Sequence, residues 1–190
     1  MENPYWHDQF KPHQTDRVEI RLLCFEIASI VEASASRQGS GITYEEGERP
    51  DVTILDELHF RLAESELSKR LLRLALLVRT FDDTMERSEG GEEYREHRKK
   101  IESELVFGTV FEGPERITET VRECSNKIIH AEDVRPVYDS DDDRNDPNAR
   151  WGMDGTIELQ GMQGQNTWMV VLYLHSYLEG VLQLVRFGEP

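Results

Sequence analysis

Four side chains between residues 119 and 130 have the types and the spacing needed for proton transfer. They are Glu119, Glu123, Asn126 and His130, which follow one another at steps of four, three and four residues. Side chains three or four residues apart share one face of a helix, so we expect a single polar stripe. An imidazole titrates near neutral pH and its second nitrogen can be fixed by a neighbour, which makes His130 the candidate general base. The alternative is an ordinary polar face that ends in a histidine near the last carbonyl groups.

The helix that would carry this stripe is expected to begin at Gly113-Pro114 and to end near His130 or Ala131. Proline is tolerated in the first turn because its missing N–H would be unpaired there anyway. The other side of this helix has apolar residues at steps of four, three and four, namely Ile117, Val121, Cys124 and Ile128. This pattern predicts an amphipathic helix that packs against a core.

The segment from Arg122 to Ala131, Arg-Glu-Cys-Ser-Asn-Lys-Ile-Ile-His-Ala, resembles the signature region of HEPN-domain proteins. Residues 126–130 fit the polar-then-apolar-then-His pattern of that family. The resemblance covers this helix and, more loosely, an all-helical layout. It implies a small α-helical bundle of the kind found in bacterial toxin–antitoxin, CRISPR-associated and other antiphage systems. Active members are metal-independent RNA endonucleases that work as dimers, so the resemblance also implies a homodimer.

The chain departs from the family pattern at the motif arginine. Four to six residues separate that arginine from the histidine in the family, and these places hold Ser125, Cys124 and Glu123 here. Arg122 is one step farther away, about 80° around the helix and about 12 Å along it from His130, so we expect no compact site between the two. Lys127, or Arg122 of the partner subunit, would have to supply the cation. The candidate catalytic residues are therefore His130, Asn126, Lys127 and Arg122.

Three functional hypotheses follow from the resemblance and the composition. The first is a HEPN-like helical protein that binds a protein partner in a bacterial or phage defence or toxin–antitoxin setting, without efficient nuclease activity. The second is an RNA endonuclease with an altered site around His130. The third is an acidic inhibitor that mimics nucleic acid. The 22 Lys and Arg against 38 Asp and Glu give a net charge of −16, which argues against a broad basic surface that binds phosphates.

No metal or cofactor is expected. The acidic stretch that begins at Asp139 offers oxygen ligands, but a calcium loop counted from there has Arg144 where glycine is needed and Arg150 where a bidentate glutamate is needed. A solvated acidic loop is the expected structure. The sequence contains no glycine-rich phosphate loop and no zinc-type spacing. Cys24 and Cys124 lie a hundred residues apart and are expected to be buried thiols.

The predicted fold is mainly α, a single domain over residues 15–190 that follows an irregular N-terminal arm at 1–14. About five helices are expected, at 16–36, 54–86, 92–106, 114–131 and from Asn166 or Thr167 onward, with a small β-hairpin before the last one and a flexible acidic loop at 139–155. His175 is expected to be a core histidine. No signal peptide or membrane span is recognisable, so a cytoplasmic protein without membrane contact is expected. The predicted core residues are Leu23, Ile27, Leu58, Leu62, Leu71, Leu74, Val121, Ile128, Leu172, Leu178 and Val181.

Overall fold

The computed structural model describes residues 15–36, 54–111, 116–118, 120–140, 151–164 and 166–189. The expected arm at 1–14, residues 141–150 of the expected acidic loop, and Glu119 lie outside the described residues. The end of that loop is not irregular, because residues 152–155 form the beginning of a strand.

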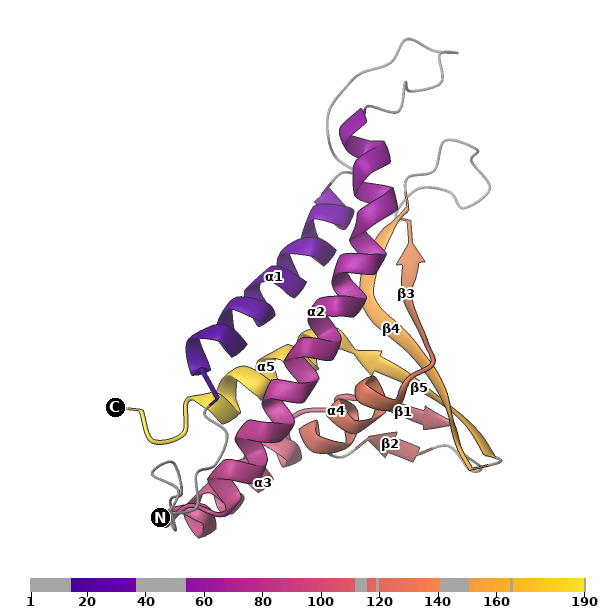
Figure 1. Ribbon diagram of the computed structural model, residues 1–190. Helices are drawn as coiled ribbons and strands as arrows, with labels where there is room; N and C mark the ends of the chain where they lie inside the picture. Colours follow the sequence, from indigo (N-terminus) through magenta and orange to yellow (C-terminus); the bar gives the residue numbers. More distant parts are fainter. Residues whose placement is uncertain are drawn as a thin grey trace, which may run out of the picture.

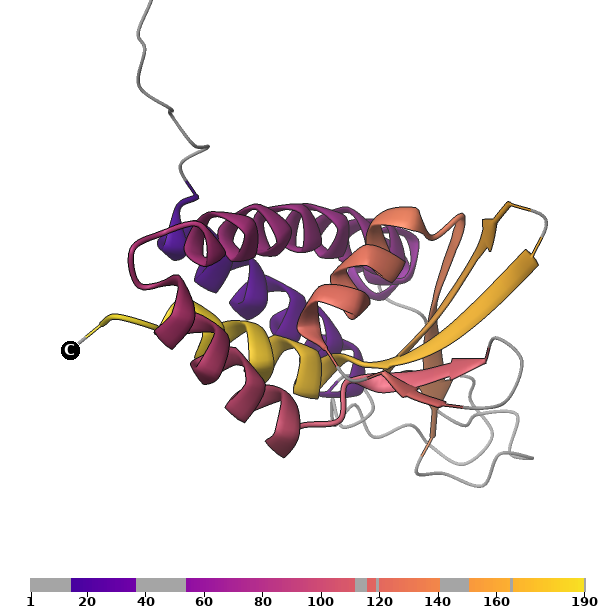
Figure 2. The same ribbon diagram turned by 90° about the horizontal axis from the view of Figure 1, so that it is seen from below.

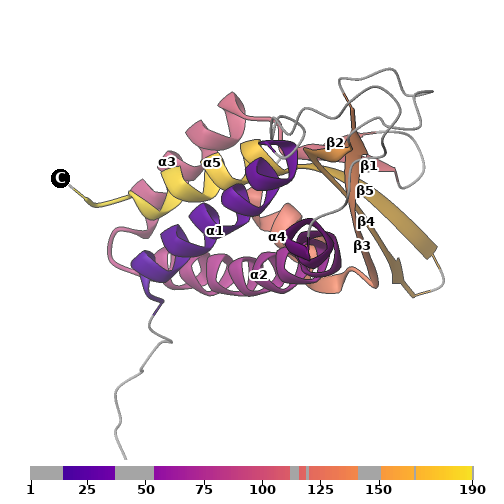
Figure 3. The same cartoon turned by 90° about the horizontal axis from the view of Figure 1, so that it is seen from above.

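Helices make up most of the described chain, and an antiparallel sheet packs beside them (Figure 1). The helices gather on one side of the sheet, as Figures 2 and 3 show from below and from above. None of the helices in the described part combines the length and the apolar character needed to cross a membrane. The elements in chain order are α1 (Arg17–Ser36), α2 (Ile54–Glu86), α3 (Gly91–Glu104), β1 (Gly108–Phe111), β2 (Arg116–Thr118), α4 (Val121–His130), β3 (Asp133–Asp139), β4 (Gly152–Gln163), β5 (Asn166–Tyr173) and α5 (Leu174–Val185).

The first three helices confirm the predicted ones closely. The side chain of Asp16 accepts a 2.7 Å hydrogen bond from the N–H of Val18, which satisfies one of the donors left free at the start of α1. The 33-residue α2 is continuous through Ser65. Residues 87–90 form the turn that separates α2 from α3, and Gly90 is the N-cap of α3.

The sheet has five strands in the order β2-β1-β5-β4-β3, and all neighbours are antiparallel. The long strand β4 pairs with β5 from Thr156↔Tyr173 to Gln163↔Asn166, so the two form a tight hairpin directly before α5. The hairpin that was predicted, from Val134 to Gln160, corresponds instead to β3 and β4, and it is part of this larger sheet. A register shift between Pro136 and Tyr138 interrupts the pairing of β3 with β4.

The predicted start of the last helix was wrong. Residues 166–173 form strand β5, in which Trp168, Val170 and Leu172 are buried, and α5 begins only at Leu174. The segment from Trp168 to Leu174 is apolar at every position, and such a run cannot be assigned to helix or strand by periodicity alone. Its aromatic and β-branched residues, Trp168, Val170, Val171 and Tyr173, favour the strand.

The predicted start of the fourth helix was also wrong. Ile117 lies in strand β2, which pairs with β1, and α4 begins at Val121. Thr120 is the N-cap, and its side chain accepts a 2.9 Å hydrogen bond from the N–H of Glu123. Thr120 and Glu123 have the spacing of a capping box, which is the sequence signal that marks the true start.

The core contains most of the predicted residues, but not all of them. Leu58 and Leu62 are 50% and 47% exposed, so their placement in the core was wrong. His175 was also misplaced, because its side chain is exposed beside Glu32 at a distance of 3.4 Å. Both cysteines are buried free thiols, as predicted. Buried side chains from α1, α2, α4, β4, β5 and α5 form one continuous cluster that joins the helices to the sheet.

Candidate functional site

The four candidate catalytic residues lie along α4 but do not converge. Arg122 is in the first turn and His130 is the last residue of this ten-residue helix. The structure therefore separates the guanidinium from the imidazole, as the spacing predicts. Cys124, Ser125 and Ile128 are buried on the inner side of α4, which orients the polar residues toward α2 and the solvent.

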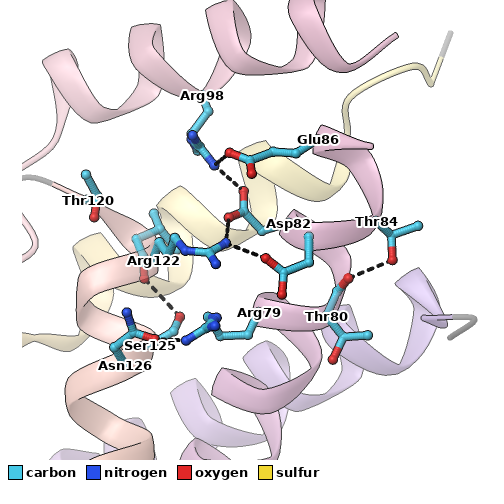
Figure 4. A network of polar contacts seen from close by, with 12 residues as sticks. Arg79, Thr80, Asp82, Thr84, Glu86, Arg98, Thr120, Arg122, Ser125 and Asn126 are labelled. Carbon is cyan, nitrogen blue, oxygen red and sulfur yellow. Dashed lines mark hydrogen bonds and ion pairs between the residues drawn. The ribbon is translucent and has the colours of Figure 1, made fainter. Parts of the chain in front are cut away.

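Arg122 points across to α2, where two carboxylates hold it (Figure 4). Its Nη1 lies 2.6 Å from Oδ2 of Asp82 and 2.7 Å from Oδ1 of Asp83. Burial opposes its charge, but the hydrogen bonds to these two residues outweigh burial and raise the pKa of Arg122. The guanidinium is thus neutralised within the chain.

Asn126 lies one turn farther along α4 and also contacts α2. Its Oδ1 accepts a hydrogen bond from Nη1 of Arg79 (Figure 4). The amide is consequently turned toward α2, four residues before the imidazole of His130. It does not act as a hydrogen-bond partner of His130 in this arrangement.

Lys127 and His130 lie on the side of α4 that approaches the sheet. The ammonium of Lys127 is 4.4 Å from the ring centroid of Trp168 on β5, within the range of a cation–π interaction. His130 is exposed, and its side chain forms no hydrogen bond or ion pair with any residue that the structure describes.

A buried network that the sequence analysis missed is centred on Asp82. This carboxylate is 2% exposed and accepts hydrogen bonds from three side chains on two helices, α3 and α4: Tyr94 Oη at 2.9 Å, Arg98 Nη1 at 2.6 Å and Arg122 Nη1 at 2.6 Å. Arg98 also pairs with Glu86 at 2.7 Å. A signal was present, because Asp82 follows the apolar stripe of α2 four residues after Val78, and a buried charge must be paired.

The same network changes the ionisation of its members. Burial, followed by the negative charge of Asp82, raises the pKa of Tyr94, so its hydroxyl stays protonated and donates. Burial also raises the pKa of Glu102 to about 7, while Arg98 opposes that shift. The side chain of Glu102 is 12% exposed, and its Oε1 lies 4.0 Å from Arg98 Nε without a hydrogen-bond partner among the described residues.

Three carboxylates of this network have the proximity of metal ligands. Oxygen atoms of Asp82, Asp83 and Glu86 all lie within 4.8 Å of one another. Each carboxylate is already paired with Arg98 or Arg122, so a divalent cation would have to displace two guanidinium groups. This arrangement fits a network of ion pairs that holds α2, α3 and α4 together, and it does not fit a metal centre.

The comparisons with known proteins leave the HEPN resemblance as a prediction. No family model, no curated protein and no solved structure matches this chain.

Proposed function

We propose that this chain acts by binding a protein partner and does not cleave RNA efficiently. The HEPN resemblance suggests the setting, a bacterial or phage defence or toxin–antitoxin system. The observation that supports the proposal is the pairing of Arg122 with both Asp82 and Asp83. A guanidinium between two carboxylates has little net charge left to attract a phosphate.

Cleavage by the family mechanism needs a cation beside the scissile phosphate and a base beside the 2′-hydroxyl. His130 is exposed and free to act as a base, which is the one feature that favours the alternative of an altered RNA endonuclease. The nearest basic residue along the helix, Lys127, is directed to Trp168. The two candidate cations, Arg122 and Lys127, thus both contact other groups of the chain, which supports the proposal of inefficient cleavage.

A cleavage assay separates the two functions. Purified protein is incubated with structured RNA in EDTA, in parallel with His130→Ala and with His175→Ala as a matched variant of another exposed histidine. We expect no cleavage by any of the three proteins. Cleavage by the wild type and by His175→Ala, lost only in His130→Ala, would overturn the binding proposal in favour of the endonuclease.

The partner is expected to be basic because the chain has a net charge of −16. The acidic-inhibitor hypothesis also depends on this charge. It differs because this chain would have to occupy the nucleic-acid-binding site of the partner. Once a partner is known, its association should weaken with salt under either hypothesis. Displacement of this chain by heparin or duplex DNA would favour mimicry, whereas a ternary complex with nucleic acid would favour a separate protein interface.

A further inference from the structure

The outward face of α2 carries four exposed leucines. Leu58, Leu62, Leu72 and Leu76 are 50%, 47%, 42% and 48% exposed. Together with Ser65 and Lys69 they occupy steps of four, three, four, three and four residues along the helix, and we name these six residues the α2 seam. Figures 2 and 3 place α2 along one edge of the molecule.

The spacing of the seam is that of a helix which packs against another helix. Apolar residues that alternate three and four positions apart repeat every 3.5 residues, the period of knobs-into-holes packing. The opposite face of α2 already packs in the core through Leu67, Leu71, Leu74 and Val78. The helix thus has two apolar faces, and the described part of the chain covers only one of them.

The seam is symmetric about residue 67, and this symmetry identifies the partner. Leu58 and Leu76 are each nine positions from residue 67, Leu62 and Leu72 are each five, and Ser65 and Lys69 are each two. In an antiparallel pair related by a two-fold axis at this level, every leucine faces a leucine and each lysine faces a serine. A parallel pair in register would instead place the two Lys69 ammonium groups opposite each other.

A groove lies beside one end of the seam. Leu58 and Leu62 line a groove of about 360 Å³ between α1 and α2. In the antiparallel register, Leu76 of the partner subunit and Leu72 of the partner subunit face this groove. The seam from residue 58 to residue 76 is about 27 Å long at 1.5 Å per residue, so the leucine layers at its two ends are well separated.

The α2 segment that carries the seam is less acidic than the chain as a whole. Residues 58–80 contain five basic and two acidic side chains, a net charge of 5 − 2 = +3 in a chain of −16. Ion pairs with α1 reduce this charge, since Arg73 pairs with Glu19 and Arg70 pairs with Glu26. The acidic residues of the chain are therefore not concentrated in the α2 segment that carries the seam.

We propose that a second copy of this chain packs antiparallel along the α2 seam to form a two-fold dimer. Sedimentation equilibrium at micromolar concentration tests it, and a mass of twice the 22.1 kDa of the chain is expected. The double variant Leu62→Glu with Leu72→Glu should be monomeric with an unchanged circular dichroism spectrum. Met162→Glu, at a 51% exposed site on β4, is the matched control and should remain dimeric.

The milder pair Leu62→Ser with Leu72→Ser provides a second variant if the glutamates prevent folding. It should raise the dimer dissociation constant about tenfold or more, because each copy loses two buried leucines. A wild-type chain that is monomeric throughout this concentration range would overturn the proposal. So would seam variants that dimerise as tightly as the wild type.

The register has its own test by disulfide cross-linking. Residues 62 and 72 lie about 15 Å apart along the same helix, so cysteines placed there cannot bridge within one chain. Leu62→Cys with Leu72→Cys should yield covalent dimers on mild oxidation, whereas Leu62→Cys alone should not. Cross-linking of the single variant would show a parallel pair, and absence of cross-linking in the double variant would exclude the antiparallel register.

Discussion

The hydroxyl of Tyr94 donates a 2.9 Å hydrogen bond to Oδ1 of Asp82, and both side chains are buried. This bond joins α3 to α2, and the same carboxylate holds Arg98 of α3 and Arg122 of α4. The carboxylate of Asp82 thus accepts hydrogen bonds from three side chains on two other helices. Asp82 therefore links α2 to both α3 and α4, the helices that surround the candidate site.

Replacement of this acceptor should be strongly destabilising. Asp82→Asn removes the negative charge and leaves two arginines partly buried, so we expect the free energy of unfolding to fall by about 3–5 kcal/mol. Asp83→Asn is the matched control because Asp83 is 37% exposed and makes one ion pair, with Arg122. It should cost about 1 kcal/mol or less. Urea denaturation measures both values, and equal losses would contradict the central role of Asp82.

Glu102 should make stability depend on pH. Its pKa is raised from 4.5 to about 7, mainly by burial, so the folded protein binds this proton more tightly than the unfolded chain. The contribution of Glu102 to the free energy of unfolding is therefore fully present below pH 4.5, where the carboxyl is protonated in both the folded and the unfolded chain. It is lost as the pH rises through about 7, because the buried carboxyl must then ionise. Glu102→Gln should remove that loss and stabilise the protein at pH 8 by about 1–3 kcal/mol, with no gain at pH 4.

Thermal or urea unfolding at the two pH values measures the effect of Glu102→Gln. Glu104 is exposed at the end of the same helix and supplies the matched control. Glu104→Gln should change the free energy of unfolding by less than about 0.5 kcal/mol at either pH. A stabilisation by Glu102→Gln that is the same at pH 4 and pH 8 would exclude titration of Glu102 as its cause.

The helices α1, α2 and α3 could be predicted because apolar spacing, caps and glycines act locally. Of the sheet, only β3 and β4 could be predicted, from the alternation at residues 156–160; β1 and β2 are short, and β5 is mostly apolar. The segment from Trp168 to Leu174 has no periodicity that distinguishes a buried strand from a buried helix. Its β structure is decided by its pairing with Gly108–Phe111 and with β4, which are distant in sequence.

The candidate site was predicted only in its outline. The separation of Arg122 from His130 follows from helix geometry alone, and the structure agrees with it. The partner of Arg122 could not be predicted, because Asp82 is 40 positions away and the contact depends on how α4 packs on α2. The same limit applies to Leu58 and Leu62, whose spacing indicates an apolar face but not what covers it.

Gly161 should be needed for the contact between β4 and the end of α4. A Cβ atom at this position would lie 2.7 Å from the carbonyl oxygen of His130 and 2.4 Å from Cζ2 of Trp168. We expect Gly161→Ala to lower the free energy of unfolding by about 1–3 kcal/mol and to change the tryptophan fluorescence, because the indole must shift. Gly90→Ala is the control, since its Cβ would meet no atom closer than 3.8 Å. Similar losses in both variants would argue against close packing at Gly161.

The two thiols should be unreactive until the protein unfolds. Thiol chemistry requires the thiolate, and burial raises the pKa of Cys24 to about 12 and that of Cys124 further. Their side chains are 3% and 0% exposed, so a reagent also lacks access. We expect 5,5′-dithiobis(2-nitrobenzoic acid) to label neither thiol in native protein and both in 8 M urea.

Asp82→Asn should speed the slow labelling of the thiols under native conditions, because labelling then proceeds through a more populated unfolded state. Immediate reaction of one thiol in the native wild type would show that its helix does not pack in the core as described.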